Sequence, residues 1–199
     1  LFGGKYNGKY FDKIKISGIQ LGGNRIDYKV NLRIDEFGFD NLDFKKQDEI
    51  LKIIQSNSID ELQKNSLSLI LSMTFDKFYL KNINYKDKAD TFILEYFEIS
   101  DWNELSVEKI LTNNLLADKS NIERFSYDRI LIEDMVFDVD SVLSLLSSGY
   151  DKKLINGDNS QIANSFKSLG NFQIENFKFI EDNKQIFSLD LAQLEDLNF

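Results

Sequence analysis

The apolar residues of this chain occur in short runs that alternate with polar residues, skip, and resume on the opposite parity. In "NFQIENFKF", Phe172 and Ile174 alternate with polar residues, and after two skipped places the pattern resumes at Phe177 and Phe179. Side chains of a plain strand alternate between the faces of a sheet with a period of two, so a skip moves the apolar set to the other face. The spacing therefore predicts a local backbone feature that resets the alternation.

The same spacing occurs in three further segments of the chain. These are "KIKISGIQL" (13–21), "KFYLKNINY" (77–85) and "RILIEDMVF" (129–137). The residue before the second apolar pair is, in chain order, Gly18, Asn82, Asp134 and Asn176. Gly, Asn and Asp most readily accept a positive φ angle or a bent backbone. We therefore predict a β-bulge at each of these four positions, which would keep both apolar pairs on one face.

In three of the four copies a second apolar strand follows a polar turn. The predicted turns are Gly22–Asn24, Lys86–Asp90 and Glu181–Lys184, all with residues suited to hairpins. The third copy has no return strand, because Phe137 is followed directly by "DVDSVLSLLSSG". The chain is predicted to be a single domain, 1–199, with four degenerate repeats at about 13–44, 77–105, 129–139 and 171–199.

The segments between the repeats have apolar residues at helical spacing. They predict helices at 47–55, 58–73, 106–116, 141–146 and 160–170. Ser58 and Glu61 match a capping box, and Gly170 suits the position after a helix. The predicted fold class is α+β, a twisted antiparallel sheet of repeated bulged β-hairpins with amphipathic helices packed on one face.

Composition narrows the possible functions. The sequence contains no Cys and no His, which excludes disulfides, thiol catalysis, Cys-ligated zinc and the Ser-His-Asp arrangement. A net charge of −9 argues against nucleic acid and anionic membranes as partners. The longest nearly apolar stretch, Leu67–Met73, is too short to cross a bilayer. We expect no transmembrane segment and no cofactor.

Carboxylates and aromatic residues supply the remaining candidate chemistry. Three acidic pairs could resemble a glycosidase pair, namely Asp35 with Glu36, Asp138 with Asp140, and Glu195 with Asp196. With 33 acidic residues such pairs arise by default, so we predict no catalytic residue and no enzyme. Asp138–Ser141 and Asn156–Ser160 are either oxygen-rich calcium loops or helix N-caps, and metal binding is left open. The aromatic residues that could line a groove or belong to the core are Phe75, Phe78, Tyr79 and Tyr85.

The repeated unit, [Ile/Phe]-x-[Ile/Leu]-x-[Gly/Asn/Asp]-[Ile/Phe/Met]-x-[Leu/Tyr/Phe] followed by a turn and a second apolar strand, resembles the hairpin repeats of bacterial envelope proteins of the AsmA and YdgA-like (DUF945) kind. The resemblance covers the four repeats and not the segments between them, and it carries no functional residue. It implies an extracytoplasmic, for example periplasmic, location with an N-terminal anchor. For AsmA-like proteins it also implies a curved sheet with an apolar concave face suited to lipids.

Two features of the ends of the sequence suggest a longer chain or a partner. The sequence begins at Leu1 without Met, and its fourth hairpin runs to Phe199, which would leave an unpaired sheet edge. We expect a non-catalytic structural or interaction module of an envelope or secreted protein that binds a protein partner, or itself, through this edge. The alternative is a domain that binds or transfers an apolar ligand such as a lipid.

Overall fold

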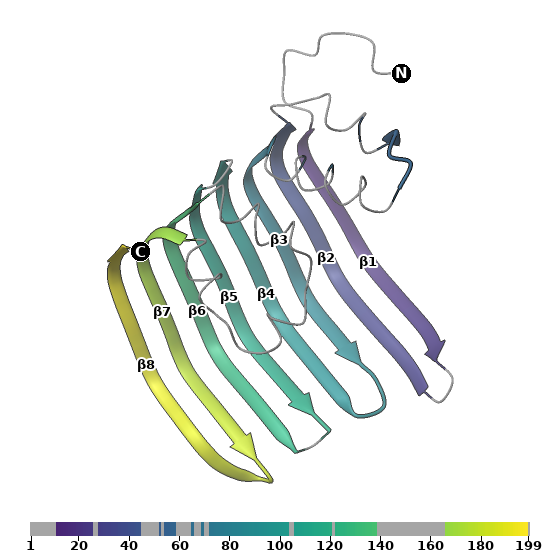
Figure 1. Cartoon of the computed structure of the whole chain (residues 1–199). Coiled ribbons are helices and arrows are strands. Elements are labelled where there is room, and N and C mark those ends of the chain that lie inside the picture. Colours follow the sequence, from purple (N-terminus) through teal and green to yellow (C-terminus); the bar gives the residue numbers. More distant parts are fainter. Residues whose placement is uncertain are drawn as a thin grey trace.

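The computed structural model describes residues 11–25, 28–44, 52, 54–58, 65, 69, 72–103, 106–120, 122–138 and 166–198. The elements of this part are eight β-strands. They are β1 (Phe11–Arg25), β2 (Tyr28–Phe44), β3 (Met73–Lys86), β4 (Asp90–Asn103), β5 (Ser106–Lys119), β6 (Glu123–Phe137), β7 (Phe166–Glu181) and β8 (Lys184–Asn198). They form a single sheet in chain order, and every neighbouring pair is antiparallel (Figure 1).

The predicted α+β class is wrong, because the described elements are strands of one sheet and include no helix packed against it. The segment 106–116, predicted as a helix, belongs to β5. Val107, Ile110 and Leu115 fit helical spacing. A strand that skips a residue at two places gives the same positions, because successive residues on one face are then three, two and three places apart. The end of the predicted helix 160–170 lies in β7. The predicted helices at 47–55, 58–73 and 141–146 lie wholly or mostly outside the described residues.

The hairpins differ from the predicted set in two places. Segment 129–137, predicted to lack a second strand, lies in β6 and is itself the return strand of β5. Gly22–Asn24, predicted as a turn, continues β1, where Gly23 pairs with Val30.

The other two predicted turns are present. Asp87 donates its N–H to the Asp90 carbonyl at 3.0 Å. Asp182 and Asn183 join β7 to β8 with φ angles of 48° and 59°, as in a two-residue type I′ turn.

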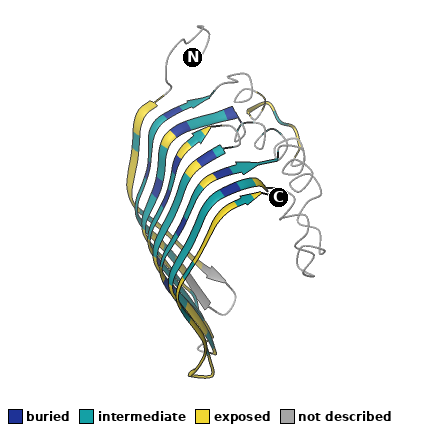
Figure 2. Ribbon diagram, turned by 90° about the vertical axis from the view of Figure 1, so that its left-hand side faces the viewer, coloured by how far each residue is buried: buried dark blue, intermediate teal, exposed yellow. Residues whose placement is uncertain are grey.

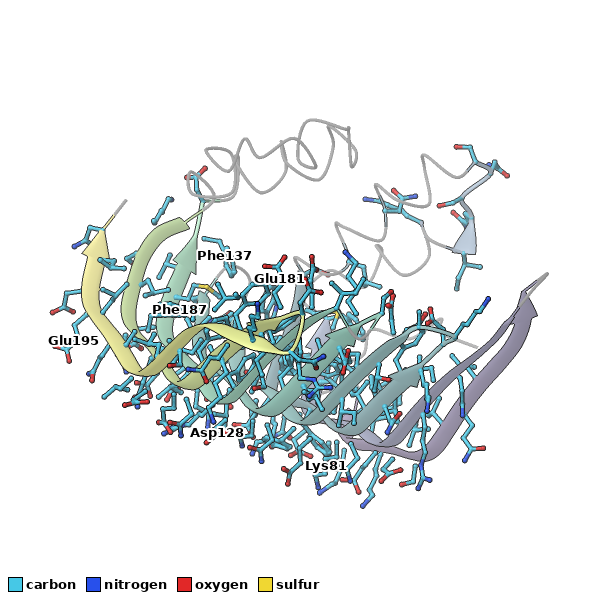
Figure 3. All side chains as sticks on the ribbon, turned by 90° about the horizontal axis from the view of Figure 1, so that it is seen from below. Lys81, Asp128, Phe137, Glu181, Phe187 and Glu195 are labelled. Carbon is cyan, nitrogen blue, oxygen red and sulfur yellow. The ribbon has the colours of Figure 1, made fainter. Side chains whose placement is uncertain are left out.

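All strands curve in the same direction, so the sheet has a concave inner face and a convex outer face (Figure 2). Phe137 lies on the inner side, whereas Lys81 and Asp128 lie on the outer side (Figure 3). Two apolar clusters fill the inner face. One is centred on Leu94, Leu115 and Tyr127, and the other on Val107, Met135 and Leu169. The rings of Phe75 and Trp102 stack beside the second cluster with centroids 6.0 Å apart.

Candidate functional site

Residues that face one another across neighbouring strands form two rows that cross the whole sheet. The row nearer the hairpin turns, called the lower row, consists of Gly18, Asp35, Asn82, Glu95, Asn114, Asp128, Asn176 and Asp190. The other, called the upper row, consists of Asp12, Asn41, Asp76, Asp101, Glu108, Asp134, Gly170 and Asp196. Each strand therefore contributes one residue to each row, and the two residues are six positions apart.

In every strand, the row residue nearer the C-terminus has a left-handed backbone. The φ angles are 71° at Gly18, 53° at Asn41, 50° at Asn82, 50° at Asp101, 53° at Asn114, 52° at Asp134, 51° at Asn176 and 51° at Asp196. Gly, Asn and Asp are the residues for which this conformation costs least. The apolar pattern of a strand skips at both rows, and the left-handed residue stands at one of the two skips. It lies in the lower row in odd-numbered strands and in the upper row in even-numbered strands.

The four predicted bulge positions are all among these left-handed residues, but they do not share one row. Gly18, Asn82 and Asn176 lie in the lower row and Asp134 in the upper row. The pairs Ser17↔Glu36 and Ile19↔Ile34 have the same register on both sides of Gly18. Neither strand gains a residue relative to its neighbour, so the feature is a matched bend of two strands and not an inserted residue.

Sequence reasoning missed four of the left-handed residues, Asn41, Asp101, Asn114 and Asp196. The signal that would have found them is an acidic residue six places earlier. It is present in every strand except β7, where Gly170 takes its place. Nearly every strand carries a ten-residue motif that starts at its acidic row residue. The motif is acid-x-apolar-x-apolar-x-[Gly/Asn/Asp]-apolar-x-apolar, and Glu104 and Thr112 are polar residues at its apolar positions.

Within each row, amide–carboxylate hydrogen bonds join the last strand of one hairpin to the first strand of the next. Between β2 and β3 they are reciprocal, because Asn82 Nδ2 donates to Asp35 Oδ2 at 3.1 Å and Asn41 Nδ2 donates to Asp76 Oδ2. Asn114 donates in the same way to Glu95 across β4 and β5. Asn176 Nδ2 donates to Asp128 Oδ2 at 2.7 Å across β6 and β7. An even-numbered strand is therefore joined to the next odd-numbered strand by side chains as well as by backbone.

The bend at Asn114 gives a direct test of this interpretation. We expect Asn114→Val to lower the free energy of unfolding by about 2 kcal/mol, because a β-branched residue at positive φ is strained and the bond to Glu95 is lost. Asn114→Gly should cost less than half as much. The control is Asn113→Val, one position earlier in the same strand and without a positive φ angle. Urea denaturation measures all three, and equal losses for the two valine variants would contradict a specific role of the bend.

The outer face carries a network of charged side chains centred on Glu98 of β4. Glu98 is only 3% exposed. Its carboxylate pairs with Lys109 Nζ at 2.6 Å and Lys77 Nζ at 3.1 Å, and it accepts hydrogen bonds from Ser100 Oγ at 2.9 Å and from the Tyr96 hydroxyl. Burial alone would raise the pKa of Glu98, but the hydrogen bonds from Lys109, Tyr96, Lys77 and Ser100 lower it from 4.5 to about 2.

Glu36 holds a similar position between β1 and β3. Its carboxylate lies 2.6 Å from Lys15 Nζ and 3.0 Å from Lys81 Nζ. These hydrogen bonds, the one from Lys15 first, lower the pKa of Glu36 to about 2. Lys81 Nζ also lies 5.0 Å from the centroid of the Tyr79 ring. The outer face therefore links successive strands through acidic residues held between lysines.

The structure does not bring the candidate carboxylate pairs together in a cleft, and several of these carboxylates already have side-chain partners. Asp35 accepts from Arg33 Nε at 2.7 Å, Asp138 pairs with Lys167 at 3.5 Å, and Glu195 accepts from Gln193 at 2.6 Å. Asp140 and the loop Asn156–Ser160 lie outside the described residues. Within the described ranges no group of three or more acidic residues is arranged to hold a metal ion. Asp35, Asp138 and Glu195 therefore serve local contacts.

The candidate aromatic residues lie on different faces of the sheet. Phe75 and Phe78 belong to the inner aromatic cluster, with centroids 6.3 Å apart. Tyr79 is buried on the outer face beside Gly38, and the Tyr85 hydroxyl donates to Asp87 Oδ2 at 2.9 Å. They do not form one ligand groove.

An open groove of about 810 Å³ follows the upper row. Five carboxylates contribute to its lining, and the described lining contains no Lys or Arg. They are Asp43, Asp76, Asp101, Glu108 and Asp134. A hydrogen bond with Asp101 raises the pKa of Glu108, as expected for neighbouring acids. This acidic lining suits neither an anion nor a purely apolar ligand.

β1 and β8 form the two edges of the sheet. Several apolar side chains on each strand are 48–60% exposed, among them Ile16 and Leu21 on β1 and Phe187 and Leu194 on β8. In the described part of the chain, no element pairs with the outer edge of β8. The row residues of this strand, Asp190 and Asp196, have no side-chain partner among the described residues. Long, exposed, partly apolar edges of this kind are sites at which another strand can add.

Comparison with known proteins gives no relative for this chain. No protein-family model matches it, and neither a curated protein nor a solved structure is significantly similar.

Proposed function

We propose that this protein is a structural or interaction module that binds a further β-strand at the open edge of β8. The observation that carries the proposal is the interruption of both rows at this strand. In β2, β4 and β6, both row residues face a row residue of the next strand. Amide–carboxylate hydrogen bonds join four of these six pairs. Asp190 and Asp196 occupy the same row positions in β8. Backbone pairing would supply affinity, and the rows would select the register.

The chemistry of the edge defines the kind of strand that fits it. An amide opposite Asp190 would reproduce the bond between Asn82 and Asp35, and a basic residue opposite Glu195 would meet an exposed carboxylate. Large apolar residues on the inner face would cover Phe187 and Leu194, which are 51% and 50% exposed. β3 has all three features at the required spacing, because it already pairs in this way with β2.

A labelled peptide of residues 74–86, which is β3 without Met73, tests the proposal. Aligned with Asn82 opposite Asp190, it places Lys77 opposite Glu195. We expect the fluorescence anisotropy of this peptide to rise on titration with the protein, with a dissociation constant of about 10–100 μM. The Asn82→Ala peptide should bind at least about fivefold more weakly, and so should the native peptide to Asp190→Ala protein, since each loses one charge-assisted hydrogen bond.

A scrambled peptide of the same composition is the control. Equal binding of the native and scrambled peptides, or no binding of the native peptide at about 1 mM, would contradict strand addition at this edge.

The alternative, an apolar ligand such as a lipid on the inner face, is supported by the exposure of Leu21, Phe125 and Phe187 near the hairpin turns. We rank it second because the groove that the structure describes is lined by carboxylates. Mass spectrometry of a solvent extract of the purified protein checks it, and absence of a co-purified lipid would count against it.

Among the residues that the structure describes, no helix has the length and hydropathy needed to cross a membrane. The envelope location stays a prediction from the resemblance.

A further inference from the structure

We infer that the strand taken up by β8 is β1 of a second copy of this chain, so that copies add head to tail into one continuous sheet. This inference rests on the proposed function and names its partner. It is argued from the direction, register and charge of the two edge strands, which are each 15 residues long.

The directions of the strands allow this addition without inverting the second copy. Every neighbouring pair in the sheet is antiparallel, so the eighth strand runs opposite to the first. A copy displaced along the sheet therefore presents its β1 antiparallel to β8. The contact is heterologous and leaves the other two edges free, so it repeats into an open chain of copies.

The two rows set one register for this contact. Gly18 and Asp12 are six positions apart in β1, as are Asp196 and Asp190 in β8. Placing Gly18 opposite Asp190 therefore places Asp12 opposite Asp196, and both bends continue into the second copy. Gly18 supplies the left-handed bend but no side-chain amide, so β1 offers the basic residue and the apolar residues of the fitting strand without the amide. Asp12 and Asp196 would face each other as Asp101 and Glu108 already do in the upper row. The apolar positions of the inner face then meet pairwise, as Phe11 with Leu197, Ile14 with Leu194, Ile16 with Ala192, Ile19 with Leu189, and Leu21 with Phe187.

Charge favours the same partner. β1 contains three basic residues and one acidic residue, a net charge of +2, within a chain whose net charge is −9. β8 contains one basic and three acidic residues, a net charge of −2. In the register fixed by the rows, Lys13 lies opposite Glu195 on the outer face. The Lys13 side chain is 66% exposed and is 3.8 Å from Asp40, so it can reach across the edge.

Edge-blocked variants test the inference in the full chain. Ile16→Glu with Leu21→Glu blocks β1, and Phe187→Glu with Leu194→Glu blocks β8. All four residues are 48–60% exposed, so the fold should tolerate the changes. Ile122→Glu is the control, because Ile122 is 52% exposed in the turn between β5 and β6 and lies on neither edge. Circular dichroism and thermal melts check that each variant is folded.

Sedimentation velocity between about 5 and 200 μM gives the readout. We expect wild type and Ile122→Glu to form concentration-dependent oligomers, and each edge-blocked variant alone to be a monomer. An equimolar mixture of the two blocked variants should form a 1:1 dimer, because only one pair of unblocked edges remains. Association of either blocked variant alone, or a mixture that stays monomeric while wild type associates, would overturn the head-to-tail contact.

A charge exchange tests the register with smaller changes. Lys13→Glu and Glu195→Lys should each weaken the association severalfold, and the double variant should restore it, since the pair is exchanged across the contact. No restoration would overturn the register.

The peptide experiment separates the two proposals. If wild type is monomeric at 200 μM while the β3 peptide binds, β8 takes up a strand but not from a second copy. If neither associates, the proposed function fails as well.

Discussion

Gly38→Ala is expected to lower the free energy of unfolding by about 1–3 kcal/mol, an overpacking cost in a buried part of the outer face. Gly38 lies opposite Tyr79 across β2 and β3, and the Tyr79 ring covers it. An added Cβ would lie 2.5 Å from Tyr79 Cζ. Tyr79 is 6% exposed and has Lys81 over its ring, so the ring cannot move aside without disturbing the lysine and Glu36.

The matched control is Gly23→Ala in β1, where an added Cβ meets nothing within 4 Å. This variant should be neutral or slightly stabilising, because alanine restricts the unfolded chain. Urea denaturation at pH 7 measures both variants. In a Tyr79→Leu background the cost of Gly38→Ala should fall by at least half. An unchanged cost in that background, or equal effects of the two alanine substitutions, would show that contact with the ring is not the cause.

The largest pH-dependent effect is expected from Glu98. Its pKa in the folded protein is about 2, against 4.5 for an unperturbed glutamate. A carboxylate with a lowered folded-state pKa stabilises the fold above its unfolded pKa, and this stabilisation is lost as the pH falls toward the folded value. Glu98 should therefore contribute on the order of 2–3 kcal/mol at pH 7, which disappears progressively between about pH 5 and pH 2.

Glu98→Gln removes the charge but keeps the shape of the side chain. We expect it to lower the free energy of unfolding at pH 7 by about 2 kcal/mol and to flatten the dependence of stability on pH below 5. Glu123→Gln is the control, because Glu123 pairs with Lys119 at 3.7 Å on the surface and such pairs contribute under about 1 kcal/mol. Thermal denaturation from pH 7 to pH 2.5 gives the comparison. A Glu98→Gln curve parallel to that of wild type would contradict this role for the Glu98 network.

The sequence allowed the prediction of the sheet but not of its extent. The skip at Gly18, Asn82 and Asn176 led to three hairpins, because a repeated break of alternation at small or amide residues is typical of strands that bend. The same kind of skip gives β5 the pattern of a helix. Ile110 and Leu115 lie three and eight residues after Val107, and both a helix and a twice-bent strand place residues at these intervals on one face. Periodicity alone could not separate the two.

The candidate edge was only partly visible in the sequence. An unpaired final strand was expected, but the two rows depend on the register of all eight strands, which no local pattern defines. An acidic residue stands six positions before nearly every left-handed residue, so the signal itself lies in the sequence. Its role depends on contacts such as the hydrogen bond between Asn82 and Asp35, which are 47 residues apart. Contacts at such separations follow from topology and not from spacing along the chain.

The common six-residue interval also bears on how such a sheet could evolve. If every strand bends at the same two levels, one hairpin can replace another without changing the curvature of its neighbours. Duplication or deletion of a hairpin within the gene would then widen or narrow the sheet and leave its profile intact. Proteins descended from a common ancestor with this architecture should accordingly differ by whole hairpins, with insertions of single residues rare between the two bends.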